Sequence, residues 1–458
     1  MRTKRINSQN ISSGARRIDG KFFLNEDSLY SAVLEDNKNK CIPLSQVAEV
    51  FNPSIFKRQF CQNTERAVMY FQSSDVPSLS EYSSVFINKK QAESLRTLVS
   101  ENQILVTGFG TIGNVRLVSK LQEGVCYANN VCRITAKSPN FYGFIYAFMA
   151  SKYAKAQLNK NASGSVVRFI EAPGIKRTLV PIVSESKQQE IHNLIVESAN
   201  LRVKANRLLE EAKILLEKEI NVHFQKELFR VGCNNIKDIF FSLQCRLDPP
   251  ALISDGVETI NKLKSKGVAF KALSECNAYV YRPGIFKRNY VEKGYPYIKG
   301  SELFDNNPFL RCQYLSKTKT PFVEQMKLRE NQILITCAGS CGQIKLITKE
   351  FEDKGAIGSQ DIIRVEAKDS LFTTEYLFIY FQIPFVFDYI QSMKYGSVIE
   401  RIEPFHVESI PIFVPSKEVS QEITDKINTY KKNMYVAFIK ENQAISLVEK
   451  EIESWQQS

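Results

Sequence analysis

The sequence has few of the residues from which metal and redox sites are built. It contains 3 histidines and 10 cysteines among 458 residues, and the cysteines are irregularly spaced. The nearest pairs, Cys126 with Cys132 and Cys337 with Cys341, lack the CxxC spacing of zinc knuckles and thioredoxin-like sites. We therefore expect reduced thiols, no metal site and no cofactor bound by this chain.

Long apolar runs are also missing. The longest, such as 141–150 and 377–387, fall far short of the roughly 20 residues that cross a bilayer. The N-terminal residues show no apolar segment of the kind found in secretory signals. These features predict a cytoplasmic protein with no membrane partner.

The overall balance is that of a globular protein with a basic surplus. Hydrophobic residues make up 43% and charged residues 24%, which is enough apolar material for two cores. The net charge of +12 favours a polyanionic partner, and nucleic acid before membrane. A basic protein without a nucleic-acid role is the alternative on charge alone.

The most prominent feature of the sequence is an internal repeat. Five segments recur in the same order, 229 to 232 residues further along the chain. Because the spacing is nearly constant, we predict a duplication with small loop insertions. The matches are Arg17–Asp19 with Arg246–Asp248, Pro53–Phe60 with Pro283–Tyr290, Glu101–Lys120 with Glu330–Lys349, Gly164–Glu171 with Gly396–Glu403, and Gln189–Ile191 with Gln421–Ile423.

Each copy ends in a heptad pattern without glycine or proline, which predicts a helix of about 35 residues, roughly 50 Å long. Two such helices at equivalent places are better explained by packing on each other than by lying separately on their own domains. The expected packing positions are Leu194, Leu201, Leu208 and Leu215 in the first helix, and Ile427, Tyr430, Met434 and Val448 in the second.

The body of each copy has the pattern of a mixed α/β domain. Apolar runs at 104–107 and 115–118, like those at 333–336 and 344–347, flank glycine-containing turns and predict hairpins. Aromatic-rich segments that follow them predict buried helices. We therefore expect an α+β fold with two similar bodies and a pair of long antiparallel coiled-coil helices, divided as 1–184, 185–222, 223–415 and 416–458.

Motifs that resemble catalytic sites each decay in one copy. The GxGxxG pattern at Gly108–Gly113 precedes a strand instead of a helix, and Cys337–Gly342 has lost its first glycine. Asp248–Pro250 lacks the aromatic residue of an amino-methyltransferase motif. The nuclease-like Asp361 and 366–368 have no acidic counterparts in the first copy. We therefore expect no catalytic residue in this chain.

Features present in both copies are the candidate DNA contacts. They are a Lys–Arg pair, a Gln or Lys position suited to reading different bases, glycines whose turn requires a positive φ, and Gly–Ser segments followed by arginine. An ordinary solvated surface is the alternative for each one. The residues are Lys57, Arg58, Gln72, Ser74, Gly110, Gly113, Gly164, Ser165 and Arg168, and Lys287, Arg288, Lys299, Ser301, Gly339, Gly342, Gly396, Ser397 and Arg401.

Over nearly its full length the chain resembles a specificity subunit of a type I restriction-modification system. The duplicated body, the two hairpins, the Gly–Ser segments and the Gln-Glu-Ile helix closing each half carry this resemblance. It implies two target-recognition domains, each reading one half of a split double-stranded DNA target, separated by the long helices. It further implies that the subunit itself is not catalytic.

The resemblance also implies partners. The helices would dock two modification (methyltransferase) subunits that bind S-adenosylmethionine, and restriction subunits with ATP-dependent motor and nuclease activity would join them. S-adenosylmethionine, ATP and Mg²⁺ are therefore expected on partner subunits. The alternatives are a stand-alone DNA methyltransferase or nuclease, and a coiled-coil scaffold without DNA contact.

Overall fold

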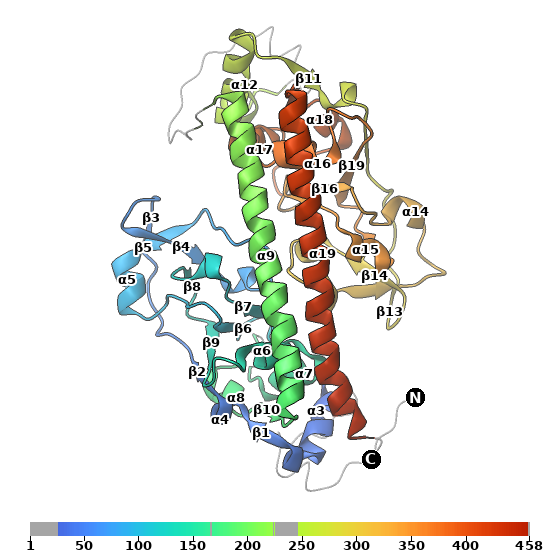
Figure 1. The fold of residues 1–458 in the computed structure, drawn as a ribbon. Coiled ribbons are helices and arrows are strands. Elements are labelled where there is room, and N and C mark those ends of the chain that lie inside the picture. Colours follow the sequence, from blue (N-terminus) through green and yellow to red (C-terminus); the bar gives the residue numbers. More distant parts are fainter. Residues whose placement is uncertain (1–25, 165–166, 223, 225–245, 457–458) are drawn as a thin grey trace. The chain divides into compact units, whose positions relative to one another are not determined.

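The computed structural model describes residues 26–164, 167–222, 224 and 246–456. The chain divides into two compact units. Unit 1 comprises residues 1–203 and 436–458, and unit 2 comprises residues 204–435. Each unit contains one copy of the repeat and part of each long helix, α9 (Glu185–Ile220) and α19 (Lys417–Ser454) (Figure 1). The repeat match at 17–19 and the candidate Ser165 lie outside the described residues.

Unit 1 has three small sheets. Their strand orders are β1-β10, β2-β9-β6-β7 and β3-β5-β4-β8. The strands are β1 (Cys41–Pro43), β2 (Ala48–Phe51), β3 (Phe60–Cys61), β4 (Ala67–Phe71), β5 (Phe86–Asn88), β6 (Ile104–Thr107), β7 (Val115–Leu117), β8 (Cys126–Tyr127), β9 (Val131–Ala136) and β10 (Leu179–Pro181). The helices beside α9 are α3 (Glu26–Asp36), α4 (Leu44–Val47), α5 (Lys89–Ser94), α6 (Tyr142–Ala150), α7 (Lys152–Asn161) and α8 (Ala172–Lys176), with 3-10 turns η1 (Lys38–Lys40), η2 (Ser73–Asp75) and η3 (Lys120–Gln122).

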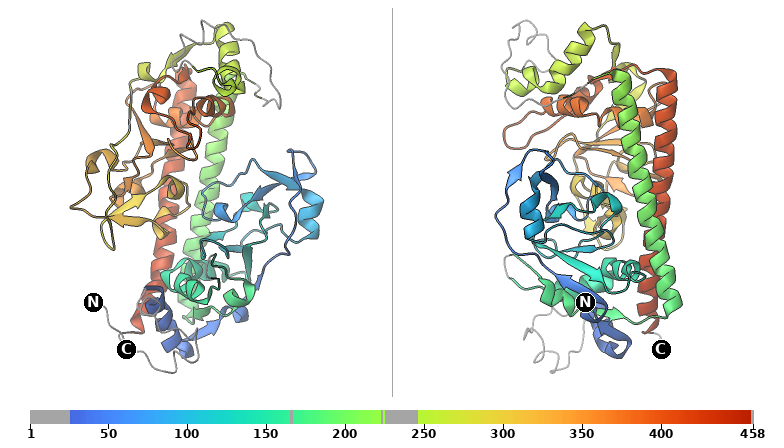
Figure 2. Two further views of the ribbon diagram at one scale, coloured as in Figure 1. Left: turned by 180° about the vertical axis from the view of Figure 1, so that it is seen from behind. Right: turned by 60° about the vertical axis from the view of Figure 1, so that its left-hand side comes forward.

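Unit 2 repeats this topology strand for strand, with the orders β11-β20, β12-β19-β16-β17 and β13-β15-β14-β18. The strands are β11 (Phe270–Ala272), β12 (Ala278–Tyr281), β13 (Tyr290–Val291), β14 (Tyr295–Ile298), β15 (Gln313–Leu315), β16 (Ile333–Thr336), β17 (Ile344–Leu346), β18 (Ile357–Gly358), β19 (Ile362–Ala367) and β20 (Pro411–Phe413). The helices are α11 (Pro249–Ile253), α12 (Asp255–Ser265), α13 (Gly300–Leu303), α14 (Val323–Met326), α15 (Lys349–Asp353), α16 (Thr374–Tyr380), α17 (Pro384–Ser392) and α18 (Pro404–Glu408), with 3-10 turns η4 (Leu273–Glu275) and η5 (Pro308–Leu310). The two mixed α/β bodies expected from the repeat are confirmed (Figure 2).

The predicted hairpins are present in both units. Strand β6 pairs antiparallel with β7, and β16 pairs in the same way with β17. Ile104 lies opposite Leu117, and Ile333 lies opposite Leu346. The centres of β6 and β16 are wholly buried, because each strand lies between two neighbours in its sheet.

Each aromatic-rich segment forms two helices where continuous apolar sequence suggests one. In unit 1 the chain breaks between α6 and α7 at Ser151, whose hydroxyl accepts a hydrogen bond from the Ala154 N–H at 3.4 Å and caps α7. In unit 2, Pro384 starts a new helix, α17, because proline fits the first turn of a helix but not its interior. Phe144, Tyr146 and Phe148 of α6 and the aromatic side chains of α16 are core residues, as expected.

The long helices run antiparallel within each unit. In each unit, residues with higher numbers in α9 contact residues with lower numbers in α19. This confirms the antiparallel pair expected from the heptad patterns. The contacting pairs are Lys187 with Glu451 and Glu197 with Lys440 in unit 1, and Glu211 with Lys426 and Glu219 with Ser416 in unit 2.

The buried face of α9 is displaced from the leucine column. The four leucines expected at its centre are only half-buried, and the fully buried positions are occupied mostly by smaller or polar side chains. The heptad spacing is present, but a second apolar stripe, the leucines, lies beside the first. The positions expected on α19, Ile427, Tyr430, Met434 and Val448, are all buried. The buried positions of α9 are Ile191, His192, Ile195, Ser198, Arg202, Ala205, Asn206, Ala212, Leu216 and Ile220.

The long helices contribute to the core of unit 1. Ile191 and Ile195 of α9 belong to one apolar cluster with Val448 and Ile452 of α19 and with strands β6 and β9. The helices therefore complete a core that the body alone would leave open. No helix in the described part of the chain has both the length and the apolar character needed to cross a membrane.

Candidate nucleic-acid interface

Each unit holds one predicted arginine against a buried tyrosine. In unit 1 the Arg58 Nε donates to the hydroxyl of Tyr70 on β4. In unit 2 the Arg288 Nε donates to the hydroxyl of Tyr297 on β14 at 2.8 Å. The guanidinium carbons lie 5.7 and 5.8 Å from the respective ring centroids. Both arginines are thus fixed to a sheet while much of each side chain still faces solvent.

Electrostatics keep Arg288 charged in this position. Burial opposes the charged form, but the phenol of Tyr297 and the carboxylate of Asp361 outweigh it and raise the pKa of Arg288 above its ordinary value. The Asp361 Oδ2 lies 3.3 Å from the arginine Nη2. The neighbouring lysines Lys57 and Lys287 are exposed in both units.

A hollow of about 730 Å³ in unit 2 brings several predicted residues together. It is open to solvent and combines cations, hydroxyl groups, one amide and one carboxylate. Four of its residues are among the predicted contacts, namely Arg288, Lys299, Ser301 and Gly339. The lining also includes Thr336, Gln343 and Asp361, which sequence reasoning did not select as contacts.

Gln72 and Lys299 occupy equivalent places, as the repeat predicts. Each precedes a short helical turn, and its backbone N–H donates to a carboxylate three residues later, that of Asp75 at 2.7 Å or Glu302 at 2.9 Å. The Lys299 ammonium also donates to Gln313 at 2.6 Å. Ser74 and Ser301 follow within these turns.

The paired glycines of the hairpin turns adopt the predicted left-handed backbone. Their φ values are 71° and 82° for Gly110 and Gly113, and 73° and 80° for Gly339 and Gly342. The Gly113 and Gly342 N–H groups donate back to the last residue of the preceding strand at 3.0 and 2.7 Å. Since these turns lead into strands, they lack the helix that a dinucleotide loop requires.

The described residues of the Gly–Ser segments contact these hairpins. Gly164 and Gly396 have φ values of 94° and 104°, and each is a position where a side chain would be strained. The Gly110 N–H donates to the Arg168 carbonyl at 3.2 Å. Ser397 is exposed.

The arginines after these segments are not equivalent. Backbone bridges pair residue 163 with 169 in unit 1 and residue 395 with 401 in unit 2. Arg401 therefore corresponds to Phe169, and Arg168 corresponds to Glu400, which binds Lys394. The alignment of Gly164–Glu171 with Gly396–Glu403 gives the same correspondence, so the two arginines are neighbours in the motif and not equivalents.

Two buried arginines were missed from the sequence. Arg133 on β9 and Arg364 on β19 have no exposed surface, and burial lowers the pKa of each to about 10. Each guanidinium donates to four backbone carbonyls. The acceptors are Thr97, Tyr127, Ala128 and Val131 for Arg133, and Met326, Gly358, Ser359 and Ile362 for Arg364. The sequence signal that could have identified them is a single arginine inside the equivalent apolar strand of each copy.

Two exposed isoleucines were also missed. Ile55 and Ile285 are 89% and 75% exposed, and each lies three residues before the arginine that contacts the buried tyrosine. Apolar side chains of this kind normally signal a core position, so periodicity did not select them.

The motifs that resembled catalytic sites have structural explanations. Asp248 precedes the first turn of α11 and pairs with Arg246, so the Asp-Pro-Pro motif is a helix start. Asp361 binds Arg288, whereas the Glu366 carboxylate accepts hydrogen bonds from Gln332 and Tyr281. These two acids therefore serve separate contacts.

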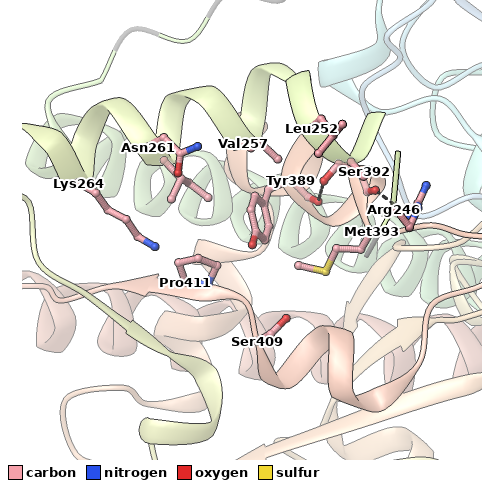
Figure 3. Close-up of a pocket in the computed structure, with 12 residues that line it drawn as sticks. Arg246, Leu252, Val257, Asn261, Lys264, Tyr389, Ser392, Met393, Ser409 and Pro411 are labelled. Atoms are coloured by element: carbon pink, nitrogen blue, oxygen red, sulfur yellow. Dashed lines mark hydrogen bonds between the residues drawn. The ribbon is translucent and has the colours of Figure 1, made fainter. Parts of the chain in front are cut away.

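A smaller hollow of about 180 Å³ lies beside helices α12 and α17 of unit 2. Figure 3 shows Val257, Asn261 and Lys264 of α12 on one side, with Tyr389 of α17 and Met393 facing them. Its lining contains none of the predicted contact residues, whereas four of them line the hollow of about 730 Å³ and two, Gly396 and Ser397, line another of about 680 Å³.

Comparison with known proteins matches residues 282–445 to the family described as type I restriction modification DNA specificity domain. Among solved structures, a type I restriction-modification S subunit from M. genitalium is 12% identical, covering 89% of this chain and 95% of that one at a TM-score of 0.38. The HsdS subunit from Thermoanaerobacter tengcongensis is 14% identical, covering 91% and 95% at a TM-score of 0.28. A search of curated proteins found no match.

The match to the specificity domain covers about a third of the chain, within the second copy of the repeat. Residues 282–445 contain β13 to β20, the larger hollow and the first part of α19 through residue 445. Unit 1 repeats the strand order of this region. The second copy of the repeat thus matches the type I restriction modification DNA specificity domain over residues 282–445.

Proposed function

We propose that this chain is the DNA-recognition subunit of a type I restriction-modification complex and has no catalytic activity of its own. The observation that carries the proposal is the duplicated constellation in a chain whose second copy matches the specificity domain. Each unit combines an arginine held by a buried tyrosine, a glycine hairpin and a Gly–Ser segment that contacts the hairpin. Arginine and backbone N–H groups are suited to phosphate, whereas the variable side chains beside them are suited to base edges.

Each unit would read one half of a bipartite target. The halves would differ in sequence, because equivalent positions hold different side chains, such as Gln72 and Lys299. The antiparallel helices would set the spacing between the halves. Helix α9 has 36 residues and α19 has 38. At 1.5 Å per residue a span of roughly 50 Å corresponds to about 15 bp, so the half-site centres should lie one helical turn or slightly more apart.

The helices also offer a surface for methyltransferase subunits. The leucine column of α9 is only half-buried, and Ile214 and Ile439 are 49% and 44% exposed. Apolar side chains exposed along a helix are suited to protein partners. S-adenosylmethionine, ATP and Mg²⁺ would be bound by the methyltransferase and motor-nuclease subunits, which would carry out the chemistry.

Methylation profiling of the host genome tests the bipartite target. The expected result is one asymmetric split motif with a fixed spacer, which disappears when the gene for this chain is deleted. A continuous or palindromic motif that depends on this chain would contradict the proposal.

A second experiment tests the absence of catalysis. The purified chain is incubated with duplex DNA, Mg²⁺ and S-adenosylmethionine, alone and with its modification subunits. We expect DNA binding that weakens with salt, and methyl transfer only when the modification subunits are present. Turnover by the isolated chain would identify an enzyme, and salt-independent behaviour without DNA binding would identify a scaffold.

A further inference from the structure

One equivalent position in the two units differs in charge at the candidate interface. Asp361 in unit 2 and Asn130 in unit 1 both immediately precede a central strand, β19 or β9. In each unit the backbone carbonyl of this residue accepts a hydrogen bond from the hairpin, from Cys337 at 3.1 Å or Gly108 at 3.4 Å. The main chain therefore accepts the same hydrogen bond in both units, and only the side chain at this position differs.

The carboxylate of Asp361 reaches the hollow of unit 2. Its side chain is 46% exposed and lies among the lining residues with Arg288, Lys299 and Gln343. In the described part of the chain, its side-chain hydrogen bonds with Arg288 and Ser359 both use Oδ2. The second oxygen, Oδ1, remains able to accept a hydrogen bond from a ligand in the hollow.

Asn130 in unit 1 has a different environment. Its side-chain amide donates to the Ser73 hydroxyl at 3.3 Å. The side chain is neutral, so it adds no negative charge at this position of unit 1. Unit 1 thus has the arginine–tyrosine contact without the acid.

A carboxylate in a site for DNA restricts what can bind there. It repels phosphate groups, and it repels the acceptor atoms of base edges, which are guanine O6 and N7 and thymine O4. The donors that face it in the major groove are the exocyclic amino groups, adenine N6 and cytosine N4. An acid therefore rejects base pairs that present only acceptors at this place, which is how a repulsive element produces specificity.

We infer that Asp361 selects, in the half-site read by unit 2, a base that presents an exocyclic amino group. This inference rests on the proposed function and adds to it a specificity-determining residue with a defined ligand chemistry. Asp361 accepts from the amino group through its free oxygen, while Arg288 holds the other oxygen in place.

The test compares the full-length chain with its Asp361→Asn variant. Each is used to select from a pool of random-sequence duplexes, and the retained DNA is sequenced. The wild type should show two half-sites, one of which has adenine or cytosine fixed at a particular position. In the variant, the preference for this base at that one position should weaken by a factor of about 5 to about 100. The other half-site should stay unchanged and serves as an internal control.

Analogue duplexes identify the group that is read. Purine in place of adenine, or 2-pyrimidinone in place of cytosine, removes only the exocyclic amino group. The wild type should bind the matching analogue at least 5-fold more weakly than the normal duplex. D361N should bind the two equally, because its amide oxygen stays with the Arg288 donor and the amide NH2 that replaces Oδ1 cannot accept from the base. Which analogue has the effect tells adenine from cytosine.

Matched variants separate this inference from simpler effects. Glu324→Gln removes one exposed negative charge from unit 2 outside the hollow and should leave both half-sites unchanged. Asn130→Asp should alter selection only in the half-site that D361N leaves intact. If D361N changes affinity for all duplexes equally, Asp361 merely positions Arg288 and the inference is wrong. If the wild type selects no sequence at all, the proposed function itself fails.

Discussion

Unit 1 and unit 2 share three sheets of identical strand order, yet corresponding positions differ in the charge that they carry. Gln72 is replaced by Lys299, and Asn130 by Asp361. Arg168 is replaced by Glu400, as the bridges in the Gly–Ser loops show. These positions lie in the hollow of unit 2, in the Gly–Ser loops, or in the matching places of unit 1.

Positions that bind the protein's own backbone behave in the opposite way. Arg133 and Arg364 are identical and make the same kind of contact with four carbonyls. The hairpin glycines keep both their identity and their positive φ. The comparison teaches that duplication has preserved the residues that shape the scaffold, together with the Lys–Arg pair, and has varied several positions at the candidate interface.

The largest expected effect comes from removing a shared scaffold residue. Arg364→Met and Arg133→Met each remove a donor from four buried carbonyls. Each carbonyl left without another partner costs roughly 1–3 kcal/mol, partly offset by the loss of a buried charge. We expect each variant to lose roughly 4 kcal/mol of unfolding free energy. Urea denaturation measures the loss, and hydrogen exchange locates it in one unit. If either variant loses less than about 1 kcal/mol of unfolding free energy, the two arginines do not stabilise their units equally.

The next effect tests how each body is attached to the long helices. In unit 1, Glu441 of α19 is fully buried and accepts from Arg202 of α9 at 2.9 Å and from the Tyr146 hydroxyl. Glu441→Gln leaves Arg202 buried without its counterion, and we expect a loss of about 3 kcal/mol in urea denaturation.

Unit 2 provides the matched variant for this test. There, a buried ion pair joins Lys431 of α19 to Glu375 of α16 at 2.5 Å, and the same ammonium also donates to Asn331. Because Lys431 keeps this second acceptor, we expect Glu375→Gln to cost less, about 1–2 kcal/mol. Equal losses would show that the two attachments are energetically the same despite their different residues.

Much of the scaffold could be predicted because it depends on local pattern. A glycine at a fixed place in a hairpin predicts a positive φ, and Gly110 and Gly339 show it. The buried stripe of α9 could not be predicted in the same way. Leucine spacing reveals that a helix is amphipathic, but the elements packed against the helix decide which of its faces is buried. In α9, Ser198 and Ala205 are buried and Leu201 is not.

The interface was predicted in part, for a similar reason. Arg58 and Arg288 were identified because they recur in both copies, and both have the tyrosine contact. Asp361 was considered only as part of a nuclease-like motif, and its role beside Arg288 depends on residues 73 positions apart meeting in space. A comparison of unlike residues at equivalent positions would have found it.

A smaller effect concerns the pH dependence of the two units. Burial lowers the pKa of His406 in unit 2 to about 4, with Glu403 opposing this shift. The neutral ring accepts the Glu403 N–H at 2.9 Å through Nδ1. The unfolded chain, whose histidine titrates near 6.5, therefore takes up the proton first as pH falls, and stability is lost between pH 6.5 and about 4.

Variants isolate this histidine from other groups. His406→Asn keeps an acceptor for the Glu403 N–H but does not titrate. The unfolding free energy of the wild type minus that of the variant should therefore decrease by about 2 kcal/mol as the pH falls from 6.5 to 4. Asp305, whose pKa burial raises to about 6, acts in the opposite sense, so the difference between wild type and variant is the quantity to measure. In unit 1, burial also lowers the pKa of His192, which accepts the Gly143 N–H at 3.2 Å. His192→Asn should show the same sign, and an opposite sign would contradict the parallel between units.

The smallest effect tests whether the exposed lysines act alike in the two units. Lys57→Ala and Lys287→Ala each remove one exposed cation beside the tyrosine-held arginine. If each lysine contacts phosphate, affinity should fall a few-fold for every duplex, and the slope of log K against log salt should decrease by about 1. Binding titrations at several salt concentrations, with both the selected duplex and an unrelated one, measure this. A loss confined to the selected duplex would mean that these lysines read bases, and residues kept identical in both units would then belong to sequence reading as well as to the scaffold.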